Sequence, residues 1–292
     1  MKAGYVCLDV GGTEIKSAAV TPAGEVVEPV AYAPARASEA AQAVIAHLAG
    51  ILQTAGKSLT RVLGAGLAFP GPFDYAGGIC LLKGLDKFDR LYGVNLRQAL
   101  AEATGITPAD IRFCNDVGAF ALGEMGFGPA AGAERAMFLC IGTGCGSAFG
   151  VHGQLAPEGY PGVPFQGYVY DRPFLEGRVD DYLSKRGLMA LTQARLGRSL
   201  AGKELAALCQ AGDKAALDCF AQFGQWLRAA AEPNLQAFRP DCLCIGGQIT
   251  KSAGYFLEPL AALCQALGIS LYVTADTSRR ALQGLTRCFP GG

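Results

Sequence analysis

Two glycine-rich turns, each set between apolar stretches, constrain the fold of this chain more than any other feature of its sequence. The first turn follows the apolar residues 5–10, contains Gly11, Gly12 and Thr13, and leads into apolar residues 15–20. Glycine can take a positive φ angle and lets another group approach the backbone, so the pattern predicts a strand, a tight turn and a returning strand. The N–H groups and the threonine hydroxyl of such a turn could hold a phosphate, although an ordinary hairpin can have the same sequence.

A second turn of the same kind favours phosphate binding over the ordinary hairpin. The apolar residues 137–141 run into Gly142, Thr143 and Gly144, and another apolar stretch follows at residues 148–151. Two such hairpins in two halves of one chain indicate a duplicated unit, in which the two turns bind phosphates from opposite sides.

Two carboxylates lie where a phosphate site would need them. Asp9 immediately precedes the first turn, and a carboxylate beside an anion-binding turn suits hydrated Mg²⁺. Asp116 follows Asn115 at the point where a predicted strand over residues 111–114 becomes a helix. It could accept a proton from a hydroxyl while the Asn115 amide orients other hydroxyls, or it could merely cap the helix.

Two further segments have the composition of binding loops. The predicted strand over residues 62–69 ends in a rigid Pro-Gly-Pro turn that contains Gly71 and delivers the carboxylate of Asp74. A plain loop would look the same. Near the end of the chain, an apolar stretch ends in Gly246 and Gly247.

Taken together, these segments resemble the ROK family of sugar kinases and repressors, within the actin, hexokinase and Hsp70 superfamily. The resemblance covers nearly the whole chain, with the motifs in the family's order. It implies an α/β fold, the two-domain actin-like ATPase (ribonuclease H-like) fold, with a mixed β-sheet in each domain and an interdomain cleft. We expect an N-terminal phosphate and substrate domain over residues 1–118 and a C-terminal nucleotide-binding domain over residues 119–292. The final helix, near residues 279–288, is expected to pack back on the first domain.

The resemblance also implies the activity, ATP-dependent phosphorylation of a sugar or polyol hydroxyl, with Asp116 as the general base. Mg²⁺ would be held by Asp9 through water. The residues expected to bind the nucleotide and its phosphates are Asp9, Gly11, Gly12, Thr13, Gly142, Thr143, Gly144, Gly246 and Gly247. The residues expected to contact the sugar in the first domain are Gly71, Asp74, Asn115 and Asp116.

The substrate side departs from the family's pattern. ROK hexose kinases carry Glu-x-Gly-His after the second phosphate turn, and a cysteine cluster that binds zinc with that histidine. Here Phe165 stands in the place of the glutamate and Tyr168 in that of the histidine, and no cysteine occurs between Cys145 and Cys209. Asp180 matches a second acidic position that contacts the sugar. We therefore expect no zinc site, and a pocket formed with Phe165, Tyr168 and Asp180 that suits a less polar or differently decorated sugar.

Composition argues against several partners. The chain has 25 Lys and Arg, 25 Asp and Glu and no basic run, so nucleic acid is not an expected partner. No apolar segment reaches the roughly 18 residues that a membrane span requires. The 11 cysteines lie mostly in apolar stretches, and no secretory signal precedes the first strand, so a reducing cytoplasm is the expected location.

Three matters stay open at this stage. Homodimers are common in the family, so a homodimer is one expectation. No helix-turn-helix segment precedes residue 5, which favours the kinase branch over the repressors. The alternatives to a kinase are a sugar-responsive binding protein without turnover and an ATP-driven conformational protein of the actin or Hsp70 type.

Hydrophobic periodicity completes the expected secondary structure. A strand is predicted over residues 26–31, and helices are predicted over residues 38–55 with Ser38 as N-cap, 95–103, 178–196, 202–211 and 214–238.

Overall fold

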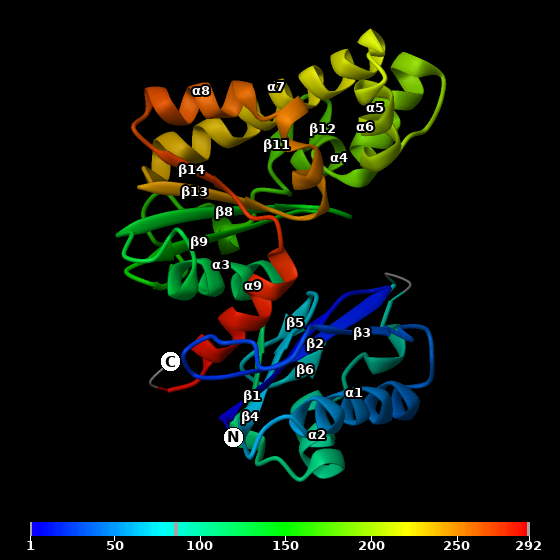
Figure 1. Cartoon of the computed structure of the whole chain (residues 1–292), viewed down its shortest axis with the longest axis vertical. Coiled ribbons are helices and arrows are strands. Elements are labelled where there is room, and N and C mark those ends of the chain that lie inside the picture. Colours follow the sequence, from blue (N-terminus) through cyan, green and yellow to red (C-terminus); the bar gives the residue numbers. More distant parts are fainter. Residues whose placement is uncertain (1, 85–86, 291–292) are drawn as a thin grey trace. The chain divides into compact units, whose positions relative to one another are not determined.

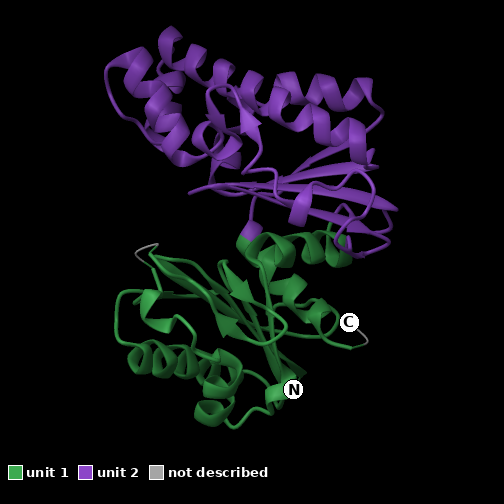
Figure 2. Ribbon diagram, turned by 180° about the vertical axis from the view of Figure 1, so that it is seen from behind, with its two compact units in different colours: residues 1–128, 278–292 green, residues 129–277 purple. Residues whose placement is uncertain are grey.

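The computed structural model of the chain describes residues 2–84 and 87–290, which form two compact α/β units (Figure 1). Unit 1 combines the residues up to Gly128 with those from Ser278 onward, and unit 2 consists of residues 129–277 (Figure 2). The boundary expected near residue 118 falls inside helix α3 (Asp116–Phe127). In the described part of the chain, no helix is both long and apolar enough to cross a lipid bilayer.

Unit 1 is built on a five-stranded mixed sheet in the order β3-β2-β1-β4-β7. Its strands are β1 (Ala3–Val10), β2 (Glu14–Val20), β3 (Ala31–Pro34), β4 (Arg61–Ala68) and β7 (Ile111–Cys114). The first three strands are antiparallel neighbours, whereas β4 runs parallel to both β1 and β7. Central strand β1 is apolar on both faces because protein covers both of them.

Helices pack around this sheet. Figure 1 shows α1 (Ala41–Gly56) and α2 (Leu96–Thr104) side by side, and α1 also contacts β1 and β2. A small hairpin, β5 (Phe73–Asp74) with β6 (Ile79–Cys80), follows β4. The unit also contains the 3₁₀ turns η1 (Asp89–Leu91) and η2 (Pro108–Asp110), helix α3 and most of α9 (Thr277–Gly284). The 3₁₀ turn η5 (Leu285–Cys288) contacts α3, β4 and β7.

Unit 2 repeats the same sheet plan in the order β10-β9-β8-β13-β14. Its strands are β8 (Arg135–Ile141), β9 (Cys145–Val151), β10 (Gln154–Leu155), β13 (Cys242–Gly246) and β14 (Ser270–Val273). An antiparallel meander is again extended by two parallel strands. Two mixed sheets of one topology confirm the predicted α/β class and the predicted duplication.

The helices of unit 2 cover its sheet and bury a phenylalanine-rich core (Figure 1). They are α4 (Val179–Tyr182), α5 (Lys185–Leu196), α6 (Gly202–Gln210), α7 (Lys214–Phe238) and α8 (Glu258–Ala266). Helix α7 has the predicted bounds, because its buried side chains recur at helical spacing over its whole length. Short elements complete the unit: η3 (Phe165–Gly167), β11 (Pro173–Phe174), β12 (Gly177–Arg178) and η4 (Gln248–Tyr255).

Three of the predicted boundaries are wrong. The strand predicted over residues 26–31 is replaced by β3, and Val26 makes only an isolated bridge to Val20. Ser38 does not cap α1, because the N–H of Glu39 donates to the carbonyl of Arg36 and closes a turn before the helix begins. The single helix predicted over residues 178–196 is split into α4 and α5 at Ser184, whose hydroxyl caps α5.

Candidate active site

The first glycine turn joins β1 to β2 and is exposed. The N–H of Gly11 donates to the carbonyl of Glu14 at 3.0 Å, and the N–H of Ala35 donates to the carbonyl of Thr13 at 2.9 Å. A β-carbon on Gly11 would lie only 2.8 Å from that Glu14 oxygen, so the turn requires glycine there. Gly12 and Thr13 are exposed, which leaves their polar groups accessible to a ligand.

Asp9 and Lys16 face each other across the β1–β2 hairpin. The two residues are paired in the register, and Lys16 Nζ lies 3.5 Å from Asp9 Oδ2. The same Nζ donates to the hydroxyl of Ser278 at 2.7 Å. A carboxylate beside an accessible turn fits hydrated Mg²⁺, which keeps several of its waters and is bound through one or two carboxylates together with substrate phosphates. Among the residues that the structure describes, no three His, Cys, Asp or Glu side chains form a metal-binding cluster.

Asn115, and not Asp116, caps helix α3. The Oδ1 of Asn115 accepts the N–H groups of Val117 at 3.0 Å and Gly118 at 3.3 Å. Asp116 is the first residue of the helix, and its side chain is exposed to solvent. Its Oδ1 also accepts the N–H of Val117 at 3.0 Å, but the N–H of Gly118 donates to Asn115, so Asn115 supplies the helix cap.

The pKa of the Asp116 carboxyl is raised above its ordinary value. Desolvation by the surrounding protein is the largest cause, and the Asp9 carboxylate raises the pKa further. The N–H of Val117 and the ammonium of Lys87 act in the opposite direction. Because the side chain is exposed, this desolvation comes from protein around the carboxyl and not from complete exclusion of water.

A chain of hydrogen bonds connects Asn115 to the loop that follows β4. Asn115 Nδ2 donates to the hydroxyl of Tyr75 at 3.3 Å, and that hydroxyl donates to the carbonyl of Phe69 at 3.0 Å. Gly71 lies beside the same hydroxyl, because a β-carbon on it would be 3.4 Å away. Asp74 instead faces its own turn, where Oδ1 accepts the N–H of Gly77 at 2.8 Å. The structure thus brings Gly71 and Asn115 together through Tyr75.

In unit 2, Asp180 supports the second glycine turn. Asp180 Oδ1 accepts the N–H of Cys145 at 2.7 Å, and a β-carbon on Gly144 would lie 2.9 Å from the same oxygen. The N–H of Lys185 donates to the carbonyl of Gly142 at 2.8 Å. The starts of α4 and α5 therefore hold the turn, while the space above Gly142 is open.

Gly247 lies close to the start of this second turn. The residue has a φ of 94°, and a β-carbon on it would lie 2.2 Å from the carbonyl oxygen of Ile141. Its N–H donates to the hydroxyl of Thr277 at 2.7 Å. Gly246 is paired with Cys140 in the parallel register of β13 and β8. Unit 2 therefore brings the predicted nucleotide-binding glycines and Asp180 into one region.

Phe165 and Tyr168 form an exposed aromatic surface. Phe165 is 77% exposed and Tyr168 is 40% exposed, and the ring centroid of Tyr168 lies 5.1 Å from that of Tyr170. The segment is anchored to β9 by Ser147, whose hydroxyl donates to the carbonyl of Gly167 at 2.6 Å. Both side chains are therefore accessible to a ligand.

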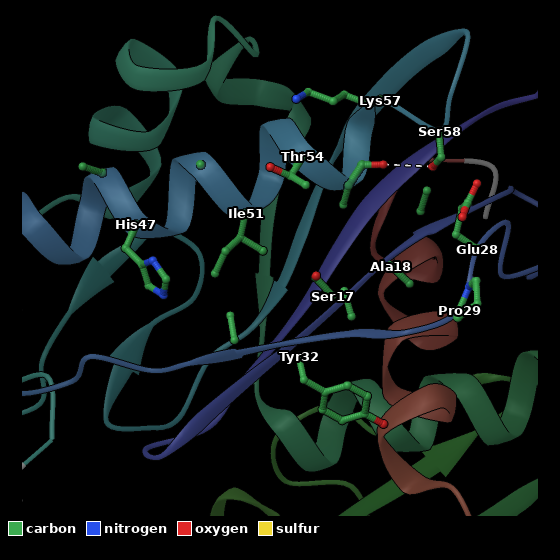
Figure 3. A pocket seen from close by; sticks show the side chains of 16 residues that line it. Ser17, Ala18, Glu28, Pro29, Tyr32, His47, Ile51, Thr54, Lys57 and Ser58 are labelled. Atoms are coloured by element: carbon green, nitrogen blue, oxygen red, sulfur yellow. Dashed lines mark hydrogen bonds between the residues drawn. The ribbon is translucent and has the colours of Figure 1, made fainter.

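A large open groove on unit 1 contains none of the predicted site residues. Figure 3 shows it between α1 and the β2–β3 edge, where its volume is about 780 Å³. Ser17, Tyr32, His47, Ile51 and Lys57 are among the residues that line it. Size alone therefore does not mark the candidate site.

Three residues of the candidate site were missed by the sequence reasoning. Lys16 could have been found, because a two-stranded hairpin with a turn at residues 11–13 places it opposite Asp9. Tyr75 and Lys87 carry no pattern in the sequence that marks them. Their contacts depend on how distant segments pack.

Comparisons with known proteins show which family and fold the chain is similar to. The model of the ROK family matches residues 5–276. A glucokinase from Halalkalibacterium halodurans is 26% identical to this chain in an alignment that covers 88% of this chain and 83% of that protein.

Solved structures are similar over almost the whole chain. The ROK hexokinase from Thermus thermophilus superposes with a TM-score of 0.80 at 24% identity, covering 97% of this chain and 96% of that one. A ROK family glucokinase from Streptomyces griseus, in complex with glucose and AMPPNP, has a TM-score of 0.77 at 18% identity, with 99% and 100% covered. These likenesses confirm the predicted actin-like ATPase fold.

Proposed function

Because the chain belongs to the ROK family, we propose that it is an ATP-dependent carbohydrate kinase that uses Asp116 as its general base. Its glucokinase relatives support phosphorylation of a sugar, and the complex of one neighbour with AMPPNP supports ATP as the phosphoryl donor. The observation that carries the assignment of the base is the state of Asp116. It is an accessible carboxyl with a raised pKa, beside Asp9 and free of the capping role that Asn115 fills.

Phosphoryl transfer requires positioned groups more than covalent chemistry from the protein. The exposed amides of Gly12 and Thr13 in the first turn would hold phosphate in unit 1, and the Gly142–Gly144 turn with Gly246 and Gly247 would hold the nucleotide in unit 2. The carboxylate of Asp116 would accept the proton of the acceptor hydroxyl as its oxygen attacks phosphorus. Asp9 would hold Mg²⁺ through water, and the ion would neutralise charge on the phosphates.

The acceptor is proposed to be less polar than glucose, or differently decorated, and its binding not to require zinc. Phe165 and Tyr168 stand at the positions of the family's glutamate and histidine, and neither can replace the charge or the metal ligand. An aromatic ring can instead bury the apolar face or an apolar substituent of a sugar.

Purified protein with ATP and Mg²⁺ should be assayed for ADP formation against glucose, its deoxy and N-acetylated derivatives, alkyl glycosides and linear polyols. We expect turnover with at least one of these acceptors. Asp116→Asn should lower kcat by about 10²- to 10⁴-fold and leave the affinity for ATP nearly unchanged, because only the proton acceptor is removed.

The outcomes separate the parts of the proposal. Equal turnover by the wild-type protein and Asp116→Asn would contradict the role of Asp116. Glucose as the best acceptor would contradict the proposal of a less polar substrate and leave the kinase assignment intact. The replacement of both polar ligands also favours a second candidate, a sugar-responsive binding protein, for which sugar would bind and no ADP would form.

The proposed location is a reducing cytoplasm. Nine of the 11 cysteines are buried in the structure. Burial of cysteine side chains in an apolar core is compatible with a compartment in which disulfides do not form.

A further inference from the structure

Lys87 lies next to the first glycine turn, and its neighbour Phe88 keeps it there. Phe88 is completely buried, and its ring centroid lies 5.1 Å from that of Phe69 in the core of unit 1. Its φ of 57° is in the left-handed region, which a phenylalanine adopts only where its surroundings impose it. The burial of Phe88 therefore fixes the position of the backbone at Lys87. The side chain of Lys87 itself is half-buried.

The segment of residues 35–37 connects this anchor to the turn. The N–H of Ala35 donates to the carbonyl of Thr13 at 2.9 Å, and the carbonyl of Ala37 accepts the N–H of Phe88 at 2.8 Å. Two backbone hydrogen bonds from one short segment thus hold the glycine turn and Phe88 side by side.

The aliphatic part of the Lys87 side chain lies against Gly12. A β-carbon on Gly12 would be 3.3 Å from Cδ of Lys87 and 3.8 Å from its Cβ. Any side chain at position 12 would therefore crowd the lysine. The absence of a side chain at Gly12 allows Lys87 to lie over the turn that is proposed to hold phosphate.

The charges around this turn leave Lys87 available to an anion. The other lysine of the site, Lys16, is shared between Asp9 and Ser278. Within residues 2–84 and 87–290, Lys87 makes no ion pair. Its ammonium is nevertheless close enough to Asp116 to lower the pKa of that carboxyl, against the effect of Asp9.

We propose that Lys87 is the phosphate-binding cation of the first glycine turn and contacts the phosphoryl group while it is transferred. The inference rests on the proposed kinase function. In the reaction the bond between the γ-phosphorus and the oxygen that bridges it to the β-phosphorus breaks. A bond to the acceptor oxygen forms, the hydroxyl proton passes to Asp116, and Lys87 keeps its own proton. A fixed ammonium would stabilise the charge on the transferred group, as lysine does at other phosphate sites.

The test compares K87M, K87Q and K87R with the control K83M. Lys83 belongs to the same loop, but its Nζ lies 5.0 Å from the ring centroid of Tyr92. K87M and K87Q should lower kcat/KM by about 10²- to 10³-fold, and both should weaken the binding of ATP more than that of ADP. K87R, which keeps the charge, should retain more activity than K87M, and K83M should match the wild-type protein.

A pH profile separates direct participation from a structural role. Of the two charged groups that act on Asp116, Asp9 raises its pKa and Lys87 lowers it, so loss of the lysine removes the only charge that lowers the pKa. The acid limb of kcat/KM should therefore move to higher pH in K87M and stay in place in K83M. The circular dichroism spectrum should be the same for all four variants as for the wild-type protein.

Two results would count against the inference in different ways. If K87M and K83M give the same rates, ATP affinities and pH profiles in an active enzyme, the role of Lys87 is wrong and the kinase assignment stands. If the wild-type protein transfers phosphate to no acceptor, the proposed function fails first and the role of Lys87 fails with it.

Discussion

At the scale of single residues, the Asp116 carboxyl binds its proton more tightly in the folded protein than an ordinary aspartate does. Desolvation and the neighbouring Asp9 carboxylate both disfavour its charged form. For a carboxyl whose pKa is raised by folding, the contribution to the stability of the folded state is greatest below the unfolded pKa of about 3.9. At such pH values the carboxyl is protonated in both the folded and the unfolded state. That contribution is lost as the pH rises through the raised pKa, because the folded state must then hold an unfavourable charge.

We therefore predict that Asp116→Asn makes the protein more stable at neutral pH while it removes activity. The asparagine carries no charge to desolvate, so the thermal midpoint of the variant should exceed that of the wild-type protein near pH 7. The difference should shrink as the pH falls through the raised pKa, and it should disappear below the unfolded pKa of about 3.9, where the carboxyl is protonated in both states. Thermal unfolding at a series of pH values measures this, and a variant less stable than the wild-type protein at neutral pH would contradict it.

The sequence predicts some residue contacts of the site and not others. The pairing of Asp9 with Lys16 follows from the position of one turn, because hairpin register is local. The contact of Lys87 with Gly12 joins residues far apart in the chain and depends on the burial of Phe88. Asn115 was predicted to orient hydroxyls, yet its Oδ1 is used to cap α3 and only its amide nitrogen faces Tyr75.

At the scale of secondary-structure elements, long amphipathic helices were predictable and their junctions were not. Helix α7 has the predicted bounds because many turns repeat one apolar stripe. Helices α4 and α5 were predicted as one, although the serine that caps α5 is a recognisable start signal. The break between the two helices matters for the second glycine turn. It allows the carboxylate of Asp180 in α4 and the N–H of Lys185 in α5 both to form hydrogen bonds with that turn.

We predict that Asp180→Ala weakens nucleotide binding more than sugar binding. Its carboxylate accepts the N–H of Cys145 at the second glycine turn, and a hydrogen bond to a charged group is worth about 1.5–3 kcal/mol. The KM for ATP should rise about tenfold or more. Steady-state kinetics with each substrate varied in turn measures the effect.

The matched control for this prediction is Asp181→Ala. The Oδ1 of Asp181 pairs with Arg186, and its Oδ2 accepts the N–H of Arg178. Neither oxygen reaches the second glycine turn. The control should leave the KM for ATP unchanged. An Asp180→Ala variant that changes only the KM of the sugar would instead support the family-based expectation that Asp180 contacts substrate.

At the scale of the whole molecule, unit 1 is assembled from two stretches of chain that are separated by all of unit 2 (Figure 2). The later stretch contributes core side chains, Leu282 and Leu285, and Phe289 stacks on Tyr5 with ring centroids 4.2 Å apart. Sequence periodicity predicted a closing helix but could not say which core it joins. The resemblance to a family supplied that expectation, because apolar stripes do not identify their partners.

We predict that Phe289→Ala lowers the free energy of unfolding by about 3 kcal/mol, the lower end for a buried phenylalanine. Phe289 is 7% exposed and also packs on Gly64 and Gly66 of strand β4. Urea denaturation measures the loss. The control is Phe165→Ala, whose ring is 77% exposed and whose loss should cost no more than about 0.5 kcal/mol. Equal stability of the two variants would contradict a packing role for Phe289.

The interrupted path of unit 1 has a consequence for biosynthesis. Domains usually fold in the order in which they leave the ribosome, the earliest first. Here the residues from 278 onward are translated only after the whole of unit 2, so β1, β4 and β7 emerge long before the segment that covers them. While unit 2 is being synthesised, the nascent first unit has apolar surface exposed, and we expect chaperones to bind it at that stage.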